Sequence, residues 1–302
     1  MRSAPTTSAE VRSGIVAVVG RPNVGKSTLV NALVGRKVAI VSDKPQTTRR
    51  GVRGIVTDDV SQLVLVDTPG FHKPRTLLGA RLNEIVGEST DGVDAIVHVV
   101  DAASGVGRGD AFVYERRVAP HAVPKVCAVN KIDAVRGRRE VPQLQAASEL
   151  GAFDEIVPTS ARTGAGVDTL KELLVALLPE GPPLYPPGEF TDAPIEERLA
   201  EIVREKALAV AREEVPHSIA VTVDDVERDG DLTKVAATIV VERDSQKGIL
   251  IGRGGETLKT IGTRAREEME AVLGTRVFLE QRVTVFREWQ RDSKALRRLG
   301  FG

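Results

Sequence analysis

The stretch GIVAVVGRPNVGKSTLVNALV, residues 14–34, decides the fold of the first half of the chain. A β-branched apolar run, a glycine-containing loop and a segment with helical apolar spacing follow one another, which predicts a strand, a tight loop and a helix. Glycines in such a loop let backbone N–H groups and the positive end of the helix point at a bound anion. We therefore expect a phosphate-binding loop made of Gly20, Arg21, Pro22, Asn23, Val24, Gly25, Lys26, Ser27 and Thr28.

Two side chains at the end of this loop suit a nucleoside polyphosphate with magnesium. Lys26 can bridge the β- and γ-phosphates, and the Ser27 hydroxyl can bind Mg²⁺. A chance glycine turn is the alternative, but the order strand, loop, helix favours the phosphate site.

Four further apolar runs precede loops and helix-like segments, which is typical of stacked βαβ units. These runs are apolar on nearly every residue, so both faces of the sheet must be covered by helices and ligands should lie beyond the carboxyl ends of the strands. We predict an α/β P-loop domain with a mainly parallel sheet and helices on both faces, its later strands being LVLVD (63–67), DAIVHVVDA (94–102), KVCAVN (125–130) and DEIVPTS (154–160).

Composition excludes several classes of protein. The 302 residues exceed one ordinary hydrophobic core, and hydrophobic and charged fractions of 41% and 28% are those of a globular protein without a membrane-spanning run. The only cysteine, Cys127, cannot form an internal disulfide, and the opening residues lack the apolar core of a secretion signal, so a cytoplasmic location is expected. Residues 243–302 hold 13 basic and 8 acidic side chains, which favours a polyanionic partner.

A proline-rich stretch separates two domains. The run PEGPPLYPPGEFTDAP can neither continue a helix nor pair as a central strand. After it we expect an α+β unit: a helix at about 194–213, two strands meeting near Asp229-Gly230, two helices around Gly252–Gly255, a strand at about 275–286 and a last helix beginning at Trp289. The predicted division is a disordered leader 1–14, a nucleotide-binding domain 15–178, a linker 179–194 and a second domain 195–302.

The nucleotide's base is predicted from Asn130, Lys131, Ile132 and Asp133, which lie at the end of the KVCAVN strand and directly after it. A carboxylate there can accept two hydrogen bonds from guanine N1–H and its 2-amino group, whereas adenine has no matching pair of donors. Four such residues are a weak pattern alone and a strong one after a phosphate loop. Ser160 and Ala161, after DEIVPT, are placed to support the base from behind.

The LVLV run ends in a second phosphate-side motif made of Asp67, Thr68, Pro69 and Gly70. Asp67 can reach Mg²⁺ through water, and the Gly70 N–H can contact the γ-phosphate. The next residue, Phe71, is apolar where many GTPases carry a glutamine that orients water, so it cannot activate water. A threonine of the loop 37–52, either Thr47 or Thr48, could close on Mg²⁺ and the γ-phosphate while GTP is bound.

A glycine loop in the second half predicts RNA binding. Ile251, Gly252, Arg253, Gly254 and Gly255 join a short helix to a longer one, and Gly-x-x-Gly between helices is the backbone clamp of KH domains. The neighbouring aliphatic residues would give an apolar groove for bases, and Arg253 adds positive charge. A helix cap is the alternative, but the βααβ setting and the basic excess favour RNA.

Taken together, these motifs resemble the Era-like GTPases of the translation-factor-related class. The resemblance runs from about residue 13 to the end, including PGFHKPR after Asp67 and the closing WQRDSKALRRLGF. It implies a type II KH domain, Thr48 as the switch threonine, GTP/GDP and Mg²⁺ as ligands, and binding to the 3′ end of small-subunit ribosomal RNA in assembly of that subunit. It also implies water positioned by backbone, a partner or K⁺ held by Asn23, and loose association with the inner face of the membrane.

Two other readings stay open at this point. One is a small-molecule kinase or ATPase on the same phosphate loop, against which the NKID segment argues. The other is an RNA- or single-stranded-DNA-binding module with a regulatory, poorly hydrolysing nucleotide site. We expect the protein to be a monomer.

Overall fold

The computed structural model describes residues 11–44, 46–74, 76–135, 140–211 and 218–301. Its contacts divide the chain into two compact units. The first, here the N-terminal unit, comprises Met1–Ala39, Gly51–His72 and Ile85–Asp192; the second, the C-terminal unit, comprises Ile40–Arg50, Lys73–Glu84 and Ala193–Gly302. Two short segments from the first half of the sequence therefore belong to the unit that contains the glycine clamp.

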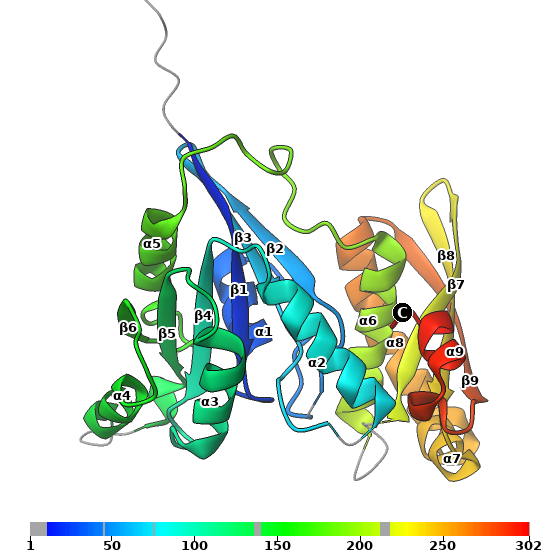
Figure 1. The fold of residues 1–302 in the computed structure, drawn as a ribbon. Helices are drawn as coiled ribbons and strands as arrows, with labels where there is room; N and C mark the ends of the chain where they lie inside the picture. The colour runs from blue at the N-terminus through cyan, green and yellow to red at the C-terminus, as the bar shows by residue number, and fades with distance from the viewer. Residues whose placement is uncertain (1–10, 45, 75, 136–139, 212–217, 302) are drawn as a thin grey trace, which may run out of the picture. The chain divides into compact units, whose positions relative to one another are not determined.

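A six-stranded sheet forms the centre of the N-terminal unit (Figure 1). All neighbouring pairs are parallel except the antiparallel pair β2–β3. The order across the sheet is β2-β3-β1-β4-β5-β6, and the strands are β1 (Arg12–Gly20), β2 (Val52–Thr57), β3 (Ser61–Asp67), β4 (Ala95–Asp101), β5 (Lys125–Asn130) and β6 (Glu155–Pro158).

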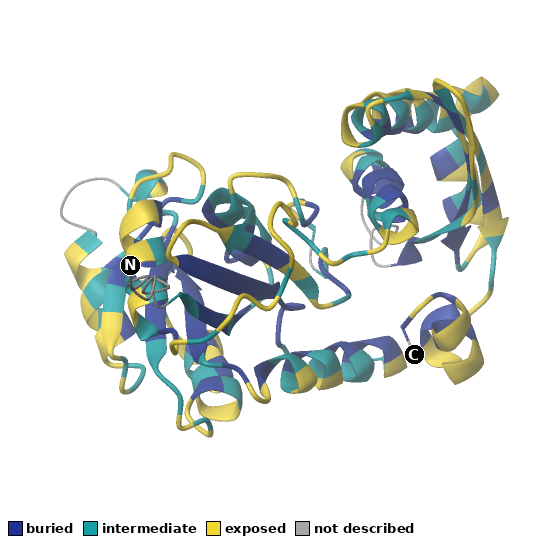
Figure 2. Ribbon diagram, turned by 90° about the horizontal axis from the view of Figure 1, so that it is seen from above, coloured by how far each residue is buried: buried dark blue, intermediate teal, exposed yellow. Residues whose placement is uncertain are grey.

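Helices cover both faces of this sheet. On one face α1 (Lys26–Val34) and α5 (Val167–Leu177) pack on alternate strand residues in one core cluster. On the other, residues of α2 (Leu77–Thr90) and α3 (Arg108–Val113), which continues as the π-helix Tyr114–Val118, form a second cluster. Helix α4 (Glu140–Ser148) contacts β5 and β6. The central strands β1, β3, β4 and β5 are buried almost throughout (Figure 2), whereas the edge strands β2 and β6 are only partly buried. Helices on both faces of a mainly parallel sheet confirm the α/β expectation.

The structure differs from the expected strands at two places. Strand β1 begins at Arg12, inside the expected leader, because Arg12 N–H donates to the Val60 carbonyl at 3.0 Å and its side chain donates to the Ala176 carbonyl at 2.7 Å. Residues 1–10 lie outside the described part of the chain. Strand β2 was not expected at all: its mixed residues, VRGIVT, lack the continuous apolar character of the others.

The proline-rich stretch belongs to the N-terminal unit as far as Asp192. The Gln62 side chain accepts from the N–H groups of Leu184 and Tyr185 at 2.6 and 2.8 Å, and its amide donates to the Tyr185 carbonyl at 2.9 Å. Ile55 N–H donates to the Phe190 carbonyl at 2.9 Å. Much of the expected linker is thus held by hydrogen bonds to the residues of β2 and β3.

The C-terminal unit has a three-stranded sheet ordered β7-β8-β9. Strands β7 (Ala220–Asp229) and β8 (Leu232–Val241) are antiparallel, and β9 (Arg276–Val285) is parallel to β8. The helices are α6 (Ile195–Val210), α7 (Asp244–Ile251), α8 (Glu256–Leu273) and α9 (Ser293–Arg298), and α6 and α8 contact the sheet and each other. Trp289 lies in a 3₁₀ turn, Trp289–Arg291, four residues before α9 and not at its start.

The part of the chain that the structure describes has no helix long and apolar enough to cross a membrane.

Candidate nucleotide and nucleic-acid sites

The predicted phosphate loop joins β1 to α1 and lies tightly against neighbouring strands. A Cβ atom at Gly20 would stand 2.5 Å from the Val99 carbonyl oxygen, and one at Gly25 would collide with the Asn130 side chain. Gly25 also has a φ of 97°, in the left-handed region that glycine adopts without strain. Both glycines are therefore required by packing, and the loop backbone is brought to the carboxyl ends of β4 and β5.

Lys26 is buried within this loop. Its Nζ donates to the carbonyl oxygens of Gly20 and Arg21 at 3.2 and 2.9 Å. Burial lowers the pKa of Lys26 to about 8, and the negative charge of Asp67 acts in the opposite direction. An ammonium group desolvated in this way interacts strongly with an anion, because the surroundings screen its charge little.

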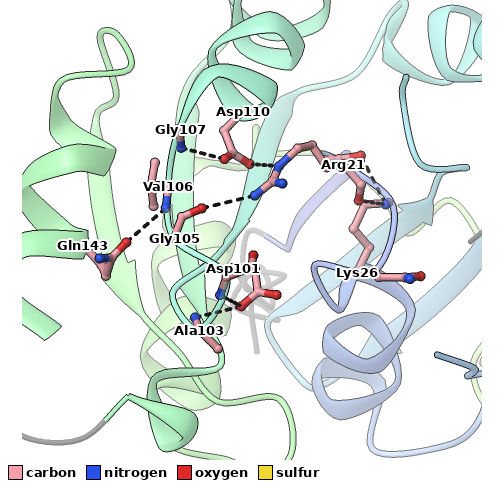
Figure 3. A network of polar contacts seen from close by, with 12 residues as sticks. Arg21, Lys26, Asp101, Ala103, Gly105, Val106, Gly107, Asp110 and Gln143 are labelled. Atoms are coloured by element: carbon pink, nitrogen blue, oxygen red, sulfur yellow. Dashed lines mark hydrogen bonds and ion pairs between the residues drawn. The ribbon is translucent and has the colours of Figure 1, made fainter. Parts of the chain in front are cut away.

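An arginine of the phosphate loop is hydrogen-bonded to helix α3 and to the loop that joins β4 to this helix, as Figure 3 shows. Arg21 Nε donates to the fully buried Asp110 at 2.7 Å, and Arg21 Nη2 donates to the Gly105 carbonyl at 3.3 Å. Asp110 also accepts from Gly107 N–H at 3.0 Å. Sequence reasoning placed Arg21 in the site but missed Asp110, because a single aspartate in a short polar helix carries no local signal.

The segment after β3 packs on the phosphate loop. Asp67 is fully buried, and its Oδ2 accepts from Ser27 Oγ at 2.6 Å. Phe71 N–H donates to the Gly20 carbonyl at 3.1 Å, and a Cβ atom at Gly70 would stand 2.6 Å from Pro22 Cα. The backbone at Gly70 is therefore held against the loop that would surround the phosphates.

The oxygen pair of Ser27 and Asp67 fits Mg²⁺. A hydroxyl and a carboxylate are the hard ligands that this ion prefers, and it usually keeps waters and phosphates as its remaining ligands. Among the described residues, no cluster of three or more His, Cys, Asp or Glu side chains could hold a metal by itself. Such a two-oxygen site therefore suits a cation that arrives with a nucleotide.

Phe71 has no polar group to offer a reacting water. Its ring is 7% exposed and stacks on Phe112, with ring centres 5.5 Å apart, while the Arg117 guanidinium lies 4.6 Å from its centre. The side chain contributes to the core between the sheet and helices α2 and α3.

The four residues at the end of β5 lie beside both the phosphate loop and the loop after β6. Asn130 donates to the Val24 carbonyl at 3.0 Å and accepts from Ala161 N–H at 3.0 Å. Lys131 donates to the Asn23 carbonyl at 2.6 Å and forms an ion pair with Asp101 at 2.7 Å. Two loops that are distant in sequence are thereby fixed in one place.

Asp133 is held with its carboxylate ionised. It accepts from Ser160 Oγ at 2.6 Å and forms an ion pair with Arg162. The Ser160 hydrogen bond is the main cause that lowers the pKa of Asp133; partial desolvation opposes it, and Arg162 adds to the lowering. The neighbouring Ile132 begins a short 3₁₀ turn, Ile132–Ala134; its N–H donates to the Thr159 carbonyl at 3.2 Å, and its side chain packs on the core beside β5.

The two candidate switch threonines lie in Ile40–Arg50, which belongs to the C-terminal unit. The Thr47 hydroxyl donates to the Lys44 carbonyl at 2.6 Å, within its own loop. Thr48 is 8% exposed. The glycine clamp lies in the same unit but in a separate part of it.

In the clamp, positive φ angles occur at Gly252 (75°), Gly254 (60°) and Gly255 (82°). A Cβ atom at Gly252 would collide with Thr257, whereas at Gly254 and Gly255 it would meet nothing within 4 Å. Gly252 is thus needed by the fold, and the backbone at Gly254 faces open space. Arg253 is exposed at the tip.

The aliphatic residues that precede the clamp differ in how far they are exposed. Leu250 is fully buried in the core of the C-terminal unit, because it lies on the inner side of α7. Ile251 is partly buried against the same core, and Ile249 is 49% exposed. Ile249 is therefore the aliphatic side chain next to the clamp that bases could contact most freely.

Cys127 is buried in β5, and its burial raises the pKa of the thiol to about 12. The thiol is consequently unreactive at neutral pH, and Cys127 serves as a small apolar core residue.

Comparison with known proteins gives matches over both units. A family model described as a 50S ribosome-binding GTPase matches residues 15–131, and a KH domain model matches residues 214–290. The chain is 53% identical over 298 residues to GTPase Era of Mycobacterium tuberculosis (strain ATCC 25618 / H37Rv) and of Mycobacterium bovis (strain ATCC BAA-935 / AF2122/97). Each of these alignments covers 97% of this chain and 99% of the relative.

Two solved structures resemble the chain over 97% of its length, each at 39% identity. One is Era in complex with MgGDPNP and nucleotides 1506–1542 of 16S ribosomal RNA, with a TM-score of 0.94 and 99% of that chain covered. The other is a tyrosine-to-alanine variant of Aquifex aeolicus Era bound to GDP·AlF4⁻, with a TM-score of 0.93 and all of that chain covered.

Proposed function

The chain belongs to the Era family of GTPases, and we propose that it is a GTP-hydrolysing switch that binds the 3′ end of small-subunit ribosomal RNA and assists assembly of that subunit. The observation that carries the proposal is the joint placement of a base-reading carboxylate, Asp133, and a phosphate loop, Gly20–Ser27, in one unit, with an open Gly-x-x-Gly clamp in the other.

Base selection falls to the carboxylate of Asp133. The carboxylate is ionised at neutral pH and would accept from two guanine donors, and Ser160 and Arg162 each hold one of its oxygens. Asn130, Lys131 and Ala161 fix the surrounding loops, and Ile132 turns the chain between them. Adenine presents no pair of donors to this carboxylate.

The phosphates would be held by the loop from Gly20 to Thr28, with Lys26 as the charged group nearest the transferring phosphoryl. Ser27, Thr48 and Asp67 are the residues that would hold Mg²⁺, which neutralises charge developing on the phosphate oxygens when bound. The Gly70 N–H, which follows Thr68 and Pro69, would contact the γ-phosphate. Thr68 secures this segment by donating to the Val18 carbonyl at 2.8 Å.

Hydrolysis in this site proceeds without a side-chain base after Gly70, since the Phe71 ring is buried in the core. We propose that K⁺, bound by Asn23, supplies the missing orienting charge. The side chain of Asn23 is exposed, and its φ of 64° is supported by the hydrogen bond from Lys131 to its carbonyl.

RNA would enter at Gly252–Gly255. Gly254 offers no side chain and faces open space, so phosphates can approach the backbone closely, while Arg253 adds charge and Ile249 and Ile251 add apolar surface. We further propose that the protein works as a monomer in the cytoplasm and associates loosely with the inner face of the cell membrane.

The double change Arg253→Asp with Gly254→Asp tests the RNA part of this proposal. We expect RNA affinity at least about tenfold weaker and a salt slope reduced by about one, because close phosphate approach is blocked and a cation is lost. GTP turnover should be retained. Filter binding with a 3′-end small-subunit RNA oligonucleotide at several salt concentrations measures the first, and phosphate release measures the second.

A matched control is available in the same unit. Arg228→Asp with Gly230→Asp makes the same charge change at an exposed hairpin, where Gly230 also has positive φ (58°) and open space. Lys26→Ala should lose turnover in the same assays. Unchanged RNA binding in a clamp variant with wild-type melting temperature would refute RNA entry at this loop, and equal binding of a matched DNA oligonucleotide would favour the single-stranded-DNA reading.

A further inference from the structure

The segment Ile40–Arg50 is built into the C-terminal unit. Ile40 is 6% exposed and belongs to the hydrophobic core of that unit. The next residue, Val41, donates its N–H to Glu205 on α6 at 3.0 Å. A segment that carries the switch threonine is therefore anchored at its start by side chains of the second half of the chain.

A second anchor follows Thr48 directly. The Arg49 side chain is 2% exposed, and its guanidinium carbon lies 5.7 Å from the centre of the Trp289 ring. Arg49 Nη1 donates to the Ile219 carbonyl at 2.6 Å. The contact with the indole ring and the hydrogen bond together fix both the position and the orientation of the guanidinium group.

The surface that receives Arg49 is itself rigid. Trp289 is fully buried, its indole N–H donates to the Ser218 carbonyl at 3.1 Å, and Phe301 stacks on its ring with centres 5.9 Å apart. We call Trp289 and the Ile219 carbonyl the arginine seat. On the other side of Thr48, the Thr47 carbonyl accepts from Arg204 of α6.

Opposing effects set the pKa of Arg49 in this seat. Burial lowers the pKa of Arg49 to about 9; the nearby Arg204 acts in the same direction, and Glu201 and Glu242 oppose both. The guanidinium therefore stays charged at neutral pH although it is desolvated. A neutral replacement would leave the Ile219 carbonyl without this donor.

We propose that Arg49 is a positioning residue for Thr48: its seat on Trp289 and Ile219 preorganises the switch segment that carries this threonine. This inference rests on the proposed function. Ordering a loop costs conformational entropy, and a segment already held on both sides of Thr48 has lost most of that freedom before the nucleotide binds. A diphosphate has no γ-phosphate for Thr48 to approach and gains nothing from the seat.

Linkage makes the effect reciprocal. If the seat favours the triphosphate, then the triphosphate must favour the seat by the same factor. Trp289 is the only tryptophan in the chain, so its fluorescence reports on the seat without a label. Acrylamide should quench it less in the presence of Mg²⁺ and GDPNP than in the presence of Mg²⁺ and GDP.

The test compares the full-length wild type with Arg49→Gln, Arg49→Lys and the control Lys44→Gln, which removes a charge from the same segment outside the seat. Calorimetric titration should show GDPNP binding about tenfold weaker in Arg49→Gln, with GDP binding changed less than twofold. Arg49→Lys should be intermediate, because an ammonium keeps the charge but lacks the planar stack. Lys44→Gln should match the wild type.

Equal weakening of GDPNP and GDP binding, or tighter GDPNP binding in Arg49→Gln, would overturn the proposal. The wild-type quenching experiment decides the matter even if Arg49→Gln does not fold, since identical quenching with the two nucleotides also overturns it. Either failure leaves the GTPase assignment intact as long as the wild type binds and hydrolyses GTP. A wild type that bound neither guanine nucleotide would remove the proposed function as well.

Discussion

At the scale of single residues, the nucleotide site depends on how the protein controls charge. Asp133 is kept ionised by a hydroxyl and an arginine, and Lys26 is kept desolvated beside Asp67. His98, in contrast, is a titratable residue that burial keeps uncharged. It lies in the middle of β4, fully buried, with Tyr114 and Phe153 as ring neighbours and no hydrogen-bond partner for either ring nitrogen in the described part of the chain.

Changing Asp133 to Asn should move base preference from guanine to xanthine. Xanthine carries an oxygen where guanine carries its 2-amino group, and an amide can donate to that oxygen while a carboxylate cannot. We expect the ratio of GTP to XTP affinity to fall by about a hundredfold or more, equivalent to roughly 3 kcal/mol, since two charge-assisted hydrogen bonds are lost. Competition titrations with both triphosphates measure it.

The control for this change is Asp168→Asn, which neutralises an exposed aspartate in the first turn of α5. It should leave the ratio unchanged. An Asp133→Asn variant that still preferred GTP over XTP would show that another group reads the base.

His98 predicts a dependence of stability on pH. Burial, and secondarily the charges of Lys26 and Arg21, lower its pKa to about 3, whereas an unfolded chain binds the proton near pH 6.5. The unfolded state therefore holds more protons between these values, and the free energy of unfolding must fall as the pH drops from about 6.5 towards 3. One such group contributes a slope of up to about 1.4 kcal/mol per pH unit.

Replacing His98 with Leu should remove that slope. Urea unfolding from pH 8 to pH 4.5 would show the wild type losing stability more steeply than the variant, with His121→Leu as a control for loss of a histidine elsewhere. If the free energy of unfolding changed with pH equally in the wild type and in His98→Leu, the imidazole would have a similar pKa in the folded and the unfolded state.

At the scale of elements, the strand ends were predictable because each one carries a motif. Gly20 ends β1, Asp67 ends β3 and Asn130 ends β5, and a parallel sheet brings these ends to one edge. Strand β2 was missed because Arg53 and Gly54 interrupt its apolar pattern. Gly54 is explained only by packing: a Cβ atom there would stand 2.7 Å from Val34 of α1.

The phosphate loop as an element predicts a potassium effect. Phe71 gives no orienting group, and Asn23 presents an exposed amide from a strained backbone position. Hydrolysis should be about tenfold faster in KCl than in NaCl at equal ionic strength, a difference of about 1.4 kcal/mol in the barrier. Asn23→Gly, which tolerates the positive φ, should abolish the difference between the salts. Identical wild-type rates in the two salts would exclude K⁺ as a participant.

At the scale of the whole molecule, the sequence predicted two domains but not which segments belong to each. Composition and the proline run predicted a boundary at 179–194. The membership of Ile40–Arg50 in the C-terminal unit instead depends on contacts such as that of Arg49 with Trp289, which are 240 residues apart. No local pattern marks such a pair. For the same reason Asp110, Arg162 and Arg204 were invisible as parts of the two sites.

The arginine seat also has a consequence for the order of synthesis. A ribosome makes the switch segment long before Trp289 and Phe301, and at about 5–20 residues per second the delay is roughly 10–50 s. Within that interval the six-stranded sheet can be completed, since β6 and α5 are made well before the seat. A nascent chain can therefore possess a folded nucleotide pocket whose switch arginine has no place to dock. The nucleotide pocket of a nascent chain can therefore fold before the residues that hold its switch segment have been synthesised.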